Sequence, residues 1–578
     1  MRPAPRLLST LVLPCLLGLA STASADDASP LKFDFSGRIQ TDLRFRTAPV
    51  GIGHFYDRVE LPAGVERNQN LLKLKAKASY GRFTALGDID FVVLGTTGKL
   101  EGLTDLTKTQ ASQPYRFDVN QLYIEAKDLF FKGLDMRVGQ QIVAWGVGDQ
   151  FNPTNNLNPN DLRDPLLFGK QAGNFMVKLD YWLTDTWSLS GVLVPLYRPA
   201  LLPDSAALGV AAIDRLPFTS DVIRHRIEAE AGFSASSIVG KPTVVNTITP
   251  VLPPASFDNM QLAFRIAGSI AEQDVALSYY VGRTDFPQPF ANHTHEGSAP
   301  SPFACNPSNP TQCDVGRLLT DVSLGFPRMH VYGLNVTGEI PLSWASKTTH
   351  GIGYRFEGAI VVPETYPLKL TQEDLNLGGI TKSAGEYDYP GGKKPNSVDG
   401  TAFAKWVLGL DYAFGSHVYV NAQWVHGLLD EFGTGYAVRA SGVTTSGSDT
   451  LTQCVVPADG KTCAAEILRP RIGNYAVAGV DLKFANDAAL LRLFSILDLT
   501  PLTDDFYDAK QAKRVQVTHS PFTREAFSMV IYPDFNYNFG NGLELGGGSL
   551  IQLGRVTTKF GDPAGGGNIV FGRARFSY

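Results

Sequence analysis

Apolar and polar residues alternate along many segments of the chain, and the first of these segments shows the alternation most clearly. From Phe33 to Phe45 the odd positions are mostly apolar, and from Asp34 to Arg46 the even positions are charged or polar. Successive side chains of a β-strand point to opposite faces, so a period of two predicts a strand with one apolar and one ionic face. Such a strand fits a soluble sandwich, where the apolar face meets a core, or a membrane barrel, where it meets lipid.

The same alternation recurs in pairs of segments that are joined by short links, of which the link between 330–340 and 354–362 is slightly longer than the others. Each segment is about the length of a tilted membrane strand, and the short links are typical of hairpin turns. With four less regular segments added, we expect about eighteen strands, with about sixteen as the alternative count. The pairs are 72–80 with 83–93, 175–183 with 187–195, 260–270 with 275–281, 330–340 with 354–362, 406–414 with 418–426 and 527–539 with 543–553; the less regular segments are 119–127, 134–142, 474–484 and 489–497.

The links between these hairpins are long, polar and irregular, and long and short links alternate strictly along the chain. Bacterial outer-membrane barrels have short periplasmic turns and long extracellular loops, whereas a sandwich has no reason to place every long link on one side. The sequence therefore predicts an all-β fold, a transmembrane antiparallel β-barrel over residues 26–578, with a periplasmic girdle of aromatic residues. The long links are 46–70, 95–117, 143–174, 196–258, 284–328, 364–402, 429–470, 500–523 and 554–566, and the girdle residues are Tyr80, Phe83, Trp187, Tyr412, Phe414 and Phe539.

Residues 1–25 are expected to be a secretory signal peptide. A positively charged start is followed by an apolar stretch and by an A-x-A cleavage site that ends at Ala25. Cys15 raises the alternative of a lipoprotein, but Pro14 stands before it where a lipoprotein signal has a small residue. We therefore expect cleavage near Ala25 and delivery to the outer membrane of a Gram-negative bacterium.

The last residues of the chain alternate in the same way and end on an aromatic residue. Val570, Phe576 and Tyr578 share one face, and Arg573 and Arg575 share the other. This ending resembles the terminal strand signal of outer-membrane barrels, which the assembly machinery is taken to recognise. The resemblance implies that the barrel-assembly machinery binds Phe576 and Tyr578, and the apolar strand faces predict contact with membrane lipid.

Composition and charge fit this class and narrow the partners. Hydrophobic residues make up 44% of the chain. Beyond the N-terminal stretch, no apolar run reaches the length of about 18 residues that a membrane helix needs. The formal net charge of −5 at pH 7 and the lack of a basic run give no case for nucleic-acid binding.

The cysteines after the signal segment form close pairs, Cys305 with Cys313 and Cys454 with Cys463. Because the periplasm is oxidising, we expect each pair to form a local disulfide inside a loop. Zinc binding is the alternative, but no histidine accompanies either pair and the spacing is not that of a zinc finger.

The segment 143–174 is the best candidate for narrowing the lumen. A barrel of about sixteen to eighteen strands leaves an aqueous channel, so its function depends on what constricts it. Pro153, Pro159 and Pro165 limit the freedom of this segment, so it can hold charged side chains at set positions. The alternative is that the loop caps the barrel and its prolines keep it compact. The charged candidates for the constriction are Asp149, Asp161, Arg163, Asp164 and Lys170.

This loop also carries two resemblances. In porins the loop after the fifth strand folds inward to form the constriction, and this loop has the same ordinal place. The stretch from Arg137 to Gly146, followed by Asp149 and Asn152-Pro153, resembles one shared by a family of large, uncharacterised proteobacterial outer-membrane proteins. The second resemblance covers a short part of the chain; it supports the barrel and implies no substrate.

Many cations lie on the inward faces of the predicted strands. The first two strands and the last one become neighbours when the barrel closes, so we expect most of these cations on one wall. A basic wall opposite an acidic loop would create a transverse field that orients dipolar solutes and sets ion preference. The alternative is that the lumen charges pair with one another and keep the wall wet. The cations are Arg38, Arg44, Lys73, Lys75, Lys77, Arg137, Arg355, Arg573 and Arg575.

Catalysis has little support in the sequence. His293-Thr294-His295-Glu296 is dense in metal-binding residue types, but it is placed in a loop and lacks the helical spacing of a zincin site. No G-x-S-x-G motif occurs. We therefore expect no enzyme, no cofactor and no metal site.

Three functions remain open. The first is an outer-membrane channel, or porin, for passive or selective diffusion of small solutes through a lumen constricted by 143–174. The second is a transporter for hydrophobic or amphipathic compounds with a blocked lumen and a lateral opening, for which 196–258 is apolar enough. The third is a structural or adhesive barrel whose loops meet something outside the cell. The sequence predicts neither the substrate nor the oligomeric state.

Overall fold

The computed structural model describes most of the chain after the N-terminal segment. The predicted signal peptide (1–25) and Cys454 lie outside the described residues. The described ranges are 31–53, 58–96, 98, 102–206, 243–297, 305–306, 309–313, 317–342, 351–377, 380–387, 397–398, 400–434, 436–441, 463–508 and 513–578.

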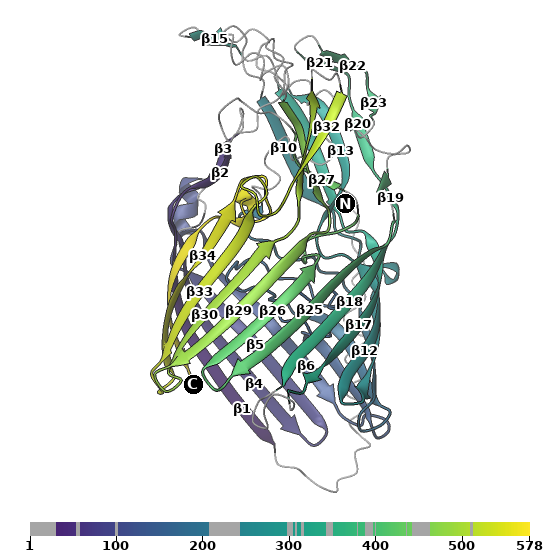
Figure 1. Cartoon of the computed structure of the whole chain (residues 1–578), viewed down its shortest axis with the longest axis vertical. Helices are drawn as coiled ribbons and strands as arrows, with labels where there is room; N and C mark the ends of the chain where they lie inside the picture. Colours follow the sequence, from purple (N-terminus) through teal and green to yellow (C-terminus); the bar gives the residue numbers. More distant parts are fainter. Residues whose placement is uncertain are drawn as a thin grey trace.

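Eighteen strands of the described residues form one sheet that closes on itself (Figure 1). Each strand pairs in antiparallel fashion with its neighbours in the chain order, and β1 closes the barrel by pairing with both β4 and the last strand, β35. The predicted antiparallel barrel and its strand number are confirmed. The strands are β1 (Lys32–Arg46), β4 (Gly64–Tyr80), β5 (Phe83–Leu94), β6 (Tyr115–Ala126), β7 (Leu134–Gln141), β8 (Asn174–Trp182), β9 (Ser188–Val194), β11 (Gln261–Ile270), β12 (Gln273–Arg283), β17 (Arg328–Ile340), β18 (Ile352–Pro363), β25 (Phe403–Phe414), β26 (Val418–His426), β29 (Asn474–Phe484), β30 (Ala489–Asp498), β33 (Ser528–Asn538), β34 (Leu543–Gly554) and β35 (Ile569–Ser577).

The alternation along each strand gives the wall an apolar outer face. On β1, Phe33 and Ile39 are 63% and 54% exposed, whereas Asp42 and Arg44 are each 1% exposed. A closed sheet pairs its backbone groups within the wall, which is the condition for strands to stand in lipid. The closed sheet and the apolar outer face together make this chain an outer-membrane β-barrel.

Short turns close the hairpins at one end of the barrel, and the C-terminus lies at the same end (Figure 1). At the turn between β11 and β12, Ala271 and Glu272 have φ angles of 50° and 65°, the backbone conformation of a tight hairpin turn. Tyr80, Phe414 and Phe539 are exposed beside the short turns, where the sequence predicts the aromatic girdle.

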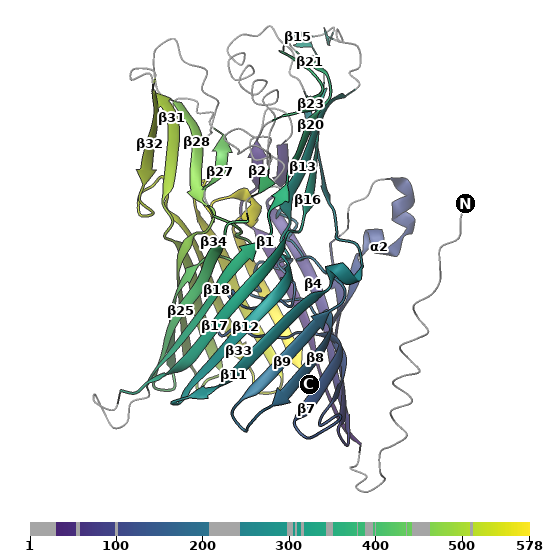
Figure 2. The same ribbon diagram turned by 90° about the vertical axis from the view of Figure 1, so that its right-hand side faces the viewer.

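Several of the long links contain further strands within the described residues, which corrects the prediction that these links are irregular. Within the described residues they form a five-stranded and a four-stranded sheet that rise at separate places above the barrel rim (Figure 2). In the first sheet β10 pairs with β16 and β13 pairs with β20 in parallel, so distant segments meet and no local hairpin signal marks them. The first sheet contains β10 (Thr243–Pro250), β16 (Arg317–Gly325), β13 (Gln288–Gly297), β20 (Lys369–Gln372) and β23 (Gly385–Glu386); the second contains β27 (Tyr436–Ser441), β28 (Cys463–Pro470), β31 (Leu502–Asp508) and β32 (Lys513–His519).

Smaller elements complete the long links. In the part of the chain that the structure describes, no helix has the length and apolar character needed to cross a membrane. The smaller elements are β2 (Val50–Gly53), β3 (Arg58–Leu61), η2 (Leu103–Thr107), α2 (Thr109–Ser112), η4 (Phe257–Asn259), β14 (Cys305–Asn306), β15 (Asn309–Cys313), β19 (Tyr366–Pro367), β21 (Leu375–Leu377), β22 (Ile380–Lys382), β24 (Ser397–Val398) and η5 (Pro563–Gly565).

The first predicted disulfide falls on one of these small hairpins. Cys305 and Cys313 are Cα partners in the antiparallel pairing of β14 with β15, so the backbone brings them opposite each other. Cys463 begins β28, and its predicted partner Cys454 lies outside the described residues. Both disulfides stay predictions.

Candidate functional site

The chain leaves the wall after Gln141 at the end of β7 and folds into the barrel interior before it rejoins the wall at β8. Asn158 ties the two ends of this segment together. Its Oδ1 accepts a hydrogen bond from Val143 N at 2.7 Å, and its Nδ2 donates to Gln141 O at 2.8 Å and to Ala172 O at 3.0 Å. One amide side chain supplies both donors and an acceptor, so a single Asn fixes the neck of the loop. We call residues 142–173 the inner loop.

Glu357 of β18 anchors the inner loop from another part of the wall. Its carboxylate accepts hydrogen bonds from the backbone N–H groups of Val147, Gly148 and Thr154 at 2.7, 2.9 and 2.8 Å, and from the Thr154 hydroxyl at 2.8 Å. Glu357 is 0% exposed and lies in the middle of β18. Hydrogen bonds to a carboxylate are about twice as strong as those between neutral groups, so this is a firm attachment.

Ion pairs fix the loop to further strands. Asp149 contacts Arg355 of β18 and accepts a hydrogen bond from Gln423 Nε2 of β26 at 2.8 Å. Asp164 accepts two hydrogen bonds from the guanidinium of Arg44 on β1, at 2.6 and 2.7 Å. A two-point contact between Arg and a carboxylate fixes orientation as well as distance. Because β1 and β18 lie far apart in the strand order, the inner loop is held from opposite parts of the wall.

Asp161 is the centre of a third charged group. It accepts a hydrogen bond from Arg163 Nε at 2.9 Å and lies 2.8 Å from Lys170 Nζ, while Arg163 also lies 3.4 Å from Asp118 of β6. Burial alone would raise the pKa of Asp161, but Arg163 and Lys170 outweigh burial and hold this pKa below its usual range. Asp161 is therefore charged at neutral pH, and its role inside the loop is to hold two cations in place.

Apolar side chains of the inner loop pack against the inner wall. Phe151 and Leu166 belong to a buried cluster with residues of β25, β26, β29, β30, β33, β34 and β35. Trp145 and Leu157 belong to a second cluster with residues of β8, β9, β11, β12, β17, β18 and β25. Burying one large apolar side chain contributes about 1.5–3 kcal/mol. With the ionic contacts to β1 and β6 added, the loop touches most of the circumference of the barrel.

The predicted site residues lie in the inner loop and on the strands of the barrel wall. The five constriction candidates lie in the inner loop, and each belongs to an ion pair: Asp149 with Arg355, Asp161 with Arg163 and Lys170, and Asp164 with Arg44. Seven of the nine predicted cations lie on the neighbouring strands β35, β1 and β4, while Arg137 lies on β7 and Arg355 on β18. Many of these cations pair with acids: Lys73 with Asp88 at 2.6 Å, Arg137 with Glu125 at 2.9 Å, Arg575 with Glu544 at 3.0 Å and Arg573 with Asp42 at 3.6 Å.

Sequence reasoning does not find the residues that anchor the loop. Glu357 stands out in the sequence only as an inward acid on a predicted strand, and Asn158 as one Asn among several. Glu357 and Val147 are 210 positions apart, so no spacing in the sequence connects them. The one usable signal is an acid on an inward face that has no cation opposite it in the predicted hairpin.

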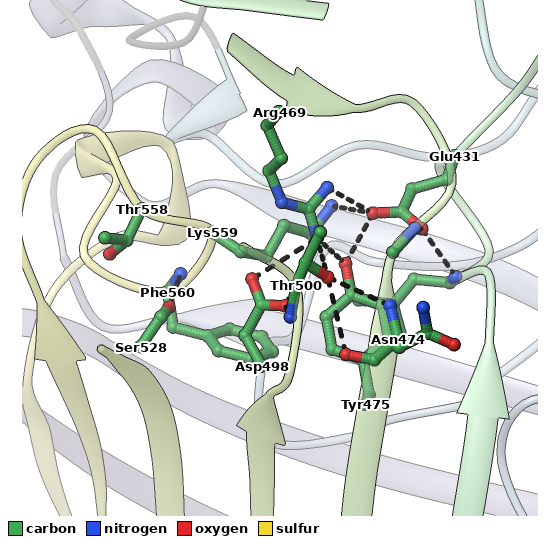
Figure 3. A network of polar contacts seen from close by, with 12 residues as sticks. Glu431, Arg469, Asn474, Tyr475, Asp498, Thr500, Ser528, Thr558, Lys559 and Phe560 are labelled. Atoms are coloured by element: carbon green, nitrogen blue, oxygen red, sulfur yellow. Dashed lines mark hydrogen bonds and ion pairs between the residues drawn. The ribbon is translucent and has the colours of Figure 1, made fainter. Parts of the chain in front are cut away.

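A second polar network that the sequence does not reveal lies where β29 and β30 leave the barrel (Figure 3). Arg469 of β28 lies 2.8 Å from Glu431 and 3.3 Å from Asp498, and Tyr475 of β29 contacts both Arg469 and Glu431. Lys559 Nζ lies 3.9 Å from Glu431. The network therefore connects several long links to the rim of the barrel.

The charge of Glu431 depends on its partners in this network. Burial would raise the pKa of Glu431, but the cations Lys559 and Arg469, the Tyr475 hydroxyl and the Gly473 N–H outweigh burial. The pKa of Glu431 is therefore held below its usual range, and the network is ionic at neutral pH.

The histidine pair singled out in the sequence lies on a strand and not in a loop. His293 and His295 are on β13; His293 Nδ1 is 2.8 Å from Thr371 Oγ1, and His295 Nε2 is 3.1 Å from Asp321 Oδ2. Among the residues that the structure describes, no group of three or more His, Cys, Asp or Glu side chains is arranged to hold a metal ion.

Comparisons with known proteins place the chain in a family. Similar solved structures include OccAB3 of Acinetobacter baumannii, with a TM-score of 0.40 and 10% identity over 95% of this chain and 99% of that one. OccK7 of Pseudomonas aeruginosa has a TM-score of 0.38 and 10% identity over 95% of this chain and 98% of that one. The outer-membrane channel DcaP of Acinetobacter baumannii has a TM-score of 0.34 and 9% identity over 96% of this chain and 100% of that one. No curated protein matches the chain. A family profile described as "Protein of unknown function (DUF1302)" matches residues 13–463, which is more than half of the sequence, so the chain belongs to this family.

Proposed function

We propose that this chain is an outer-membrane channel for the passive or selective diffusion of small solutes, and that the inner loop forms its constriction. The observation that carries the proposal is the anchoring of the loop inside the barrel by Glu357 on one part of the wall and by Arg44 on another. A cap would rest on strand ends, whereas Glu357 lies in the middle of its strand. The proposed constriction residues are Asp149, Asp161, Arg163, Asp164 and Lys170.

Charged side chains below the inner loop support the passage of polar solutes. Lys75 and Lys77 of β4 are exposed and lie on the inward face, near the short-turn end of the strand. In the pairing with β1, Lys75 lies opposite Ser36 and Lys77 opposite Asp34. Exposed charges along a lumen keep it wet and set its ion preference.

Single-channel recording of the refolded full-length protein in planar bilayers tests this proposal. We compare the wild type with Glu357→Gln, which places an amide N–H₂ group where the loop needs acceptors. Each buried donor left without a partner costs about 1–3 kcal/mol, so the loop should loosen and the conductance steps should grow. Glu544→Gln, which removes a lumen acid paired with Arg575 and away from the loop, is the matched control.

The outcomes separate the parts of the proposal. Discrete steps in the wild type that grow in Glu357→Gln and not in Glu544→Gln support a channel constricted by the inner loop. Equal steps in all three proteins would leave a channel but overturn the role of the loop. A silent bilayer with correctly folded, heat-modifiable protein in every case rejects the channel.

The edge of β6 favours a second candidate function, transport of amphipathic compounds through the wall. The pairing of β6 with β7 ends at Leu122 and Gln140. In the part of the chain that the structure describes, residues 115–121 of β6 therefore have no partner strand on the β7 side. Arg163 of the inner loop contacts Asp118 at this edge, so a lateral opening here would require the loop to move away from β6. If the bilayer is silent, a fluorescent amphipathic probe should bind the protein, and Phe117→Lys at this edge should weaken binding more than Phe535→Lys on β33.

A further inference from the structure

A cavity of about 50 Å³ lies on the extracellular side of the inner loop. The inner loop contributes an asparagine-rich segment, 152–160, to one side of it, and the extracellular ends of β17, β18 and β25 contribute Met329, Val361 and Phe403. A single water needs at least about 10–15 Å³, so the space holds only a few waters or one small molecule.

Two ionic groups of the cavity wall retain free hydrogen-bonding capacity. The Lys405 ammonium carries three donors, and among the described residues it donates one hydrogen bond, to Leu428 O at 2.7 Å. Asp285 Oδ2 accepts two hydrogen bonds from Asn160, each at 2.8 Å, whereas its Oδ1 accepts none from another described residue. Both side chains are only partly buried and line the cavity, so they are open to a ligand.

The two other acids of the cavity wall are already held in ion pairs, and Arg283 is partly occupied. Arg283 donates to Phe326 O at 2.7 Å and to Asn259 Oδ1 at 2.6 Å, while its Nε is buried and has no hydrogen-bond partner among the described residues. Asp430 lies 2.6 Å from Lys559 Nζ, and Glu431 is held in the network of Arg469. Lys405 and Asp285 therefore face the same cavity as a cation and an anion that form no ion pair with each other, and the free Nε of Arg283 adds a donor beside them.

We propose that this cavity binds a small zwitterion, with the carboxylate of the ligand at Lys405 and its ammonium group at Asp285. The asparagine amides supply further donors and acceptors, and the apolar residues accept a short side chain. Ligand sites of this kind combine mostly apolar walls with a few converging polar groups. Separated opposite charges at a narrowing also orient dipolar solutes, because such a solute contacts both charges and a singly charged solute contacts only one. The inference rests on the proposed channel and names its substrate class.

Isothermal titration calorimetry on the full-length protein in detergent tests the site without any need for conduction. The probes are alanine, propionate and ethylamine at neutral pH, which share a short carbon chain and differ in their charges. Alanine should bind most tightly, and Lys405→Met should weaken alanine and propionate by about tenfold or more, because a charge-assisted hydrogen bond is lost. Asp285→Asn, which keeps an oxygen for Asn160, should weaken alanine and ethylamine but not propionate.

Lys178→Met is the matched control, because Lys178 is a barrel lysine that pairs with Asp180 and does not line the cavity. It should leave all three affinities at the wild-type value. If Lys405→Met does not fold, Asp285→Asn still tests the site, because it should lower the affinity for alanine and leave the affinity for propionate unchanged. If alanine gives no heat of binding, or if the three probes bind with equal affinity, the proposed zwitterion site is wrong even when the bilayer recordings show a channel. If alanine binds as expected but the bilayer stays silent, the proposed channel is wrong and the zwitterion site stands.

Discussion

Arg44 is one of the residues through which the wall of the barrel holds the inner loop. Its guanidinium pairs with Asp42 on its own strand and with Asp164 in the loop. Breaking a buried ion pair by removing one partner costs about 3–5 kcal/mol, whereas replacing both partners by apolar residues costs far less. We therefore expect Arg44→Met to destabilise the folded barrel strongly, and Arg44→Met with Asp164→Leu to be more stable than the sum of the single effects predicts.

Urea unfolding followed by heat-modifiable migration measures this double-mutant cycle. Arg573 lies 3.6 Å from Asp42, so Asp42 keeps a cation when Arg44 is removed. The control cycle uses Arg137 and Glu125, a lumen pair of similar separation that does not contact the inner loop. Strictly additive effects at Arg44 and Asp164 would contradict the anchoring role of this pair.

Glu431 makes the extracellular network sensitive to acid. Its pKa is lowered in the folded chain, so the unfolded chain binds more protons and stability rises with pH through this range. The contribution of Glu431 is present above its ordinary pKa of 4.5 and is lost as the pH falls toward the lower folded value. We expect the midpoint of thermal unfolding to drop between about pH 5 and about pH 3.

Calorimetric unfolding scans across this pH interval check the expectation. Glu431→Gln removes the titrating group, so it should start less stable and lose less stability over the same interval. Glu339→Gln, at an exposed residue near the end of β17, should follow the wild type. A wild-type slope that survives unchanged in Glu431→Gln would contradict the assignment.

At the scale of elements, β7 depends on a close approach to β6. Gly139 has a φ of 133°, and a Cβ at this position would lie 2.3 Å from Leu122 O of β6. Gly139→Ala should therefore weaken the short β6–β7 pairing, with backbone strain alone costing about 1–3 kcal/mol. The yield of heat-modifiable protein after refolding measures the effect. Gly572→Ala on β35, where a Cβ meets no atom within 4 Å, should refold like the wild type.

The barrel strands can be predicted because their sequence signal is local. The strands above the barrel cannot be predicted in this way, because their partners lie far apart in the sequence. Alternation and a short turn define a hairpin within a few residues of sequence, as for the predicted segment 418–426 and the observed β26, Val418–His426. By contrast, Val244 of β10 lies opposite Leu318 of β16 in a parallel pairing. Two segments so far apart carry no local mark of their partner, so their sheet stays hidden in the sequence.

At the scale of the whole molecule, the same contrast explains how much of the candidate site the sequence reveals. The prolines and the ordinal place of the inner loop identify the segment, and its charged residues can be named in advance. Their partners cannot, because Glu357 and Arg44 reach the loop only after the barrel closes. The unpaired charges of the cavity, Lys405 and Asp285, depend in addition on which neighbouring charges are already satisfied, and this is a property of the folded lumen alone.

The lumen as a whole should prefer anions, although the chain has a formal net charge of −5. The acids of the inner loop are neutralised by their partners, whereas Lys75 and Lys77 are exposed on the inward face of β4. At about 0.1 M salt, screening acts over about 10 Å, so charges on the lumen wall outweigh those on the outer loops. The reversal potential in a KCl gradient should therefore indicate anion selectivity, and Lys75→Glu with Lys77→Glu should shift it toward cation selectivity. Lys127→Glu with Lys132→Glu makes the same charge change in the β6–β7 turn outside the lumen, and it should leave the reversal potential nearly unchanged. An equal shift of the reversal potential in both double variants would contradict the inference that the β4 wall sets the ion selectivity.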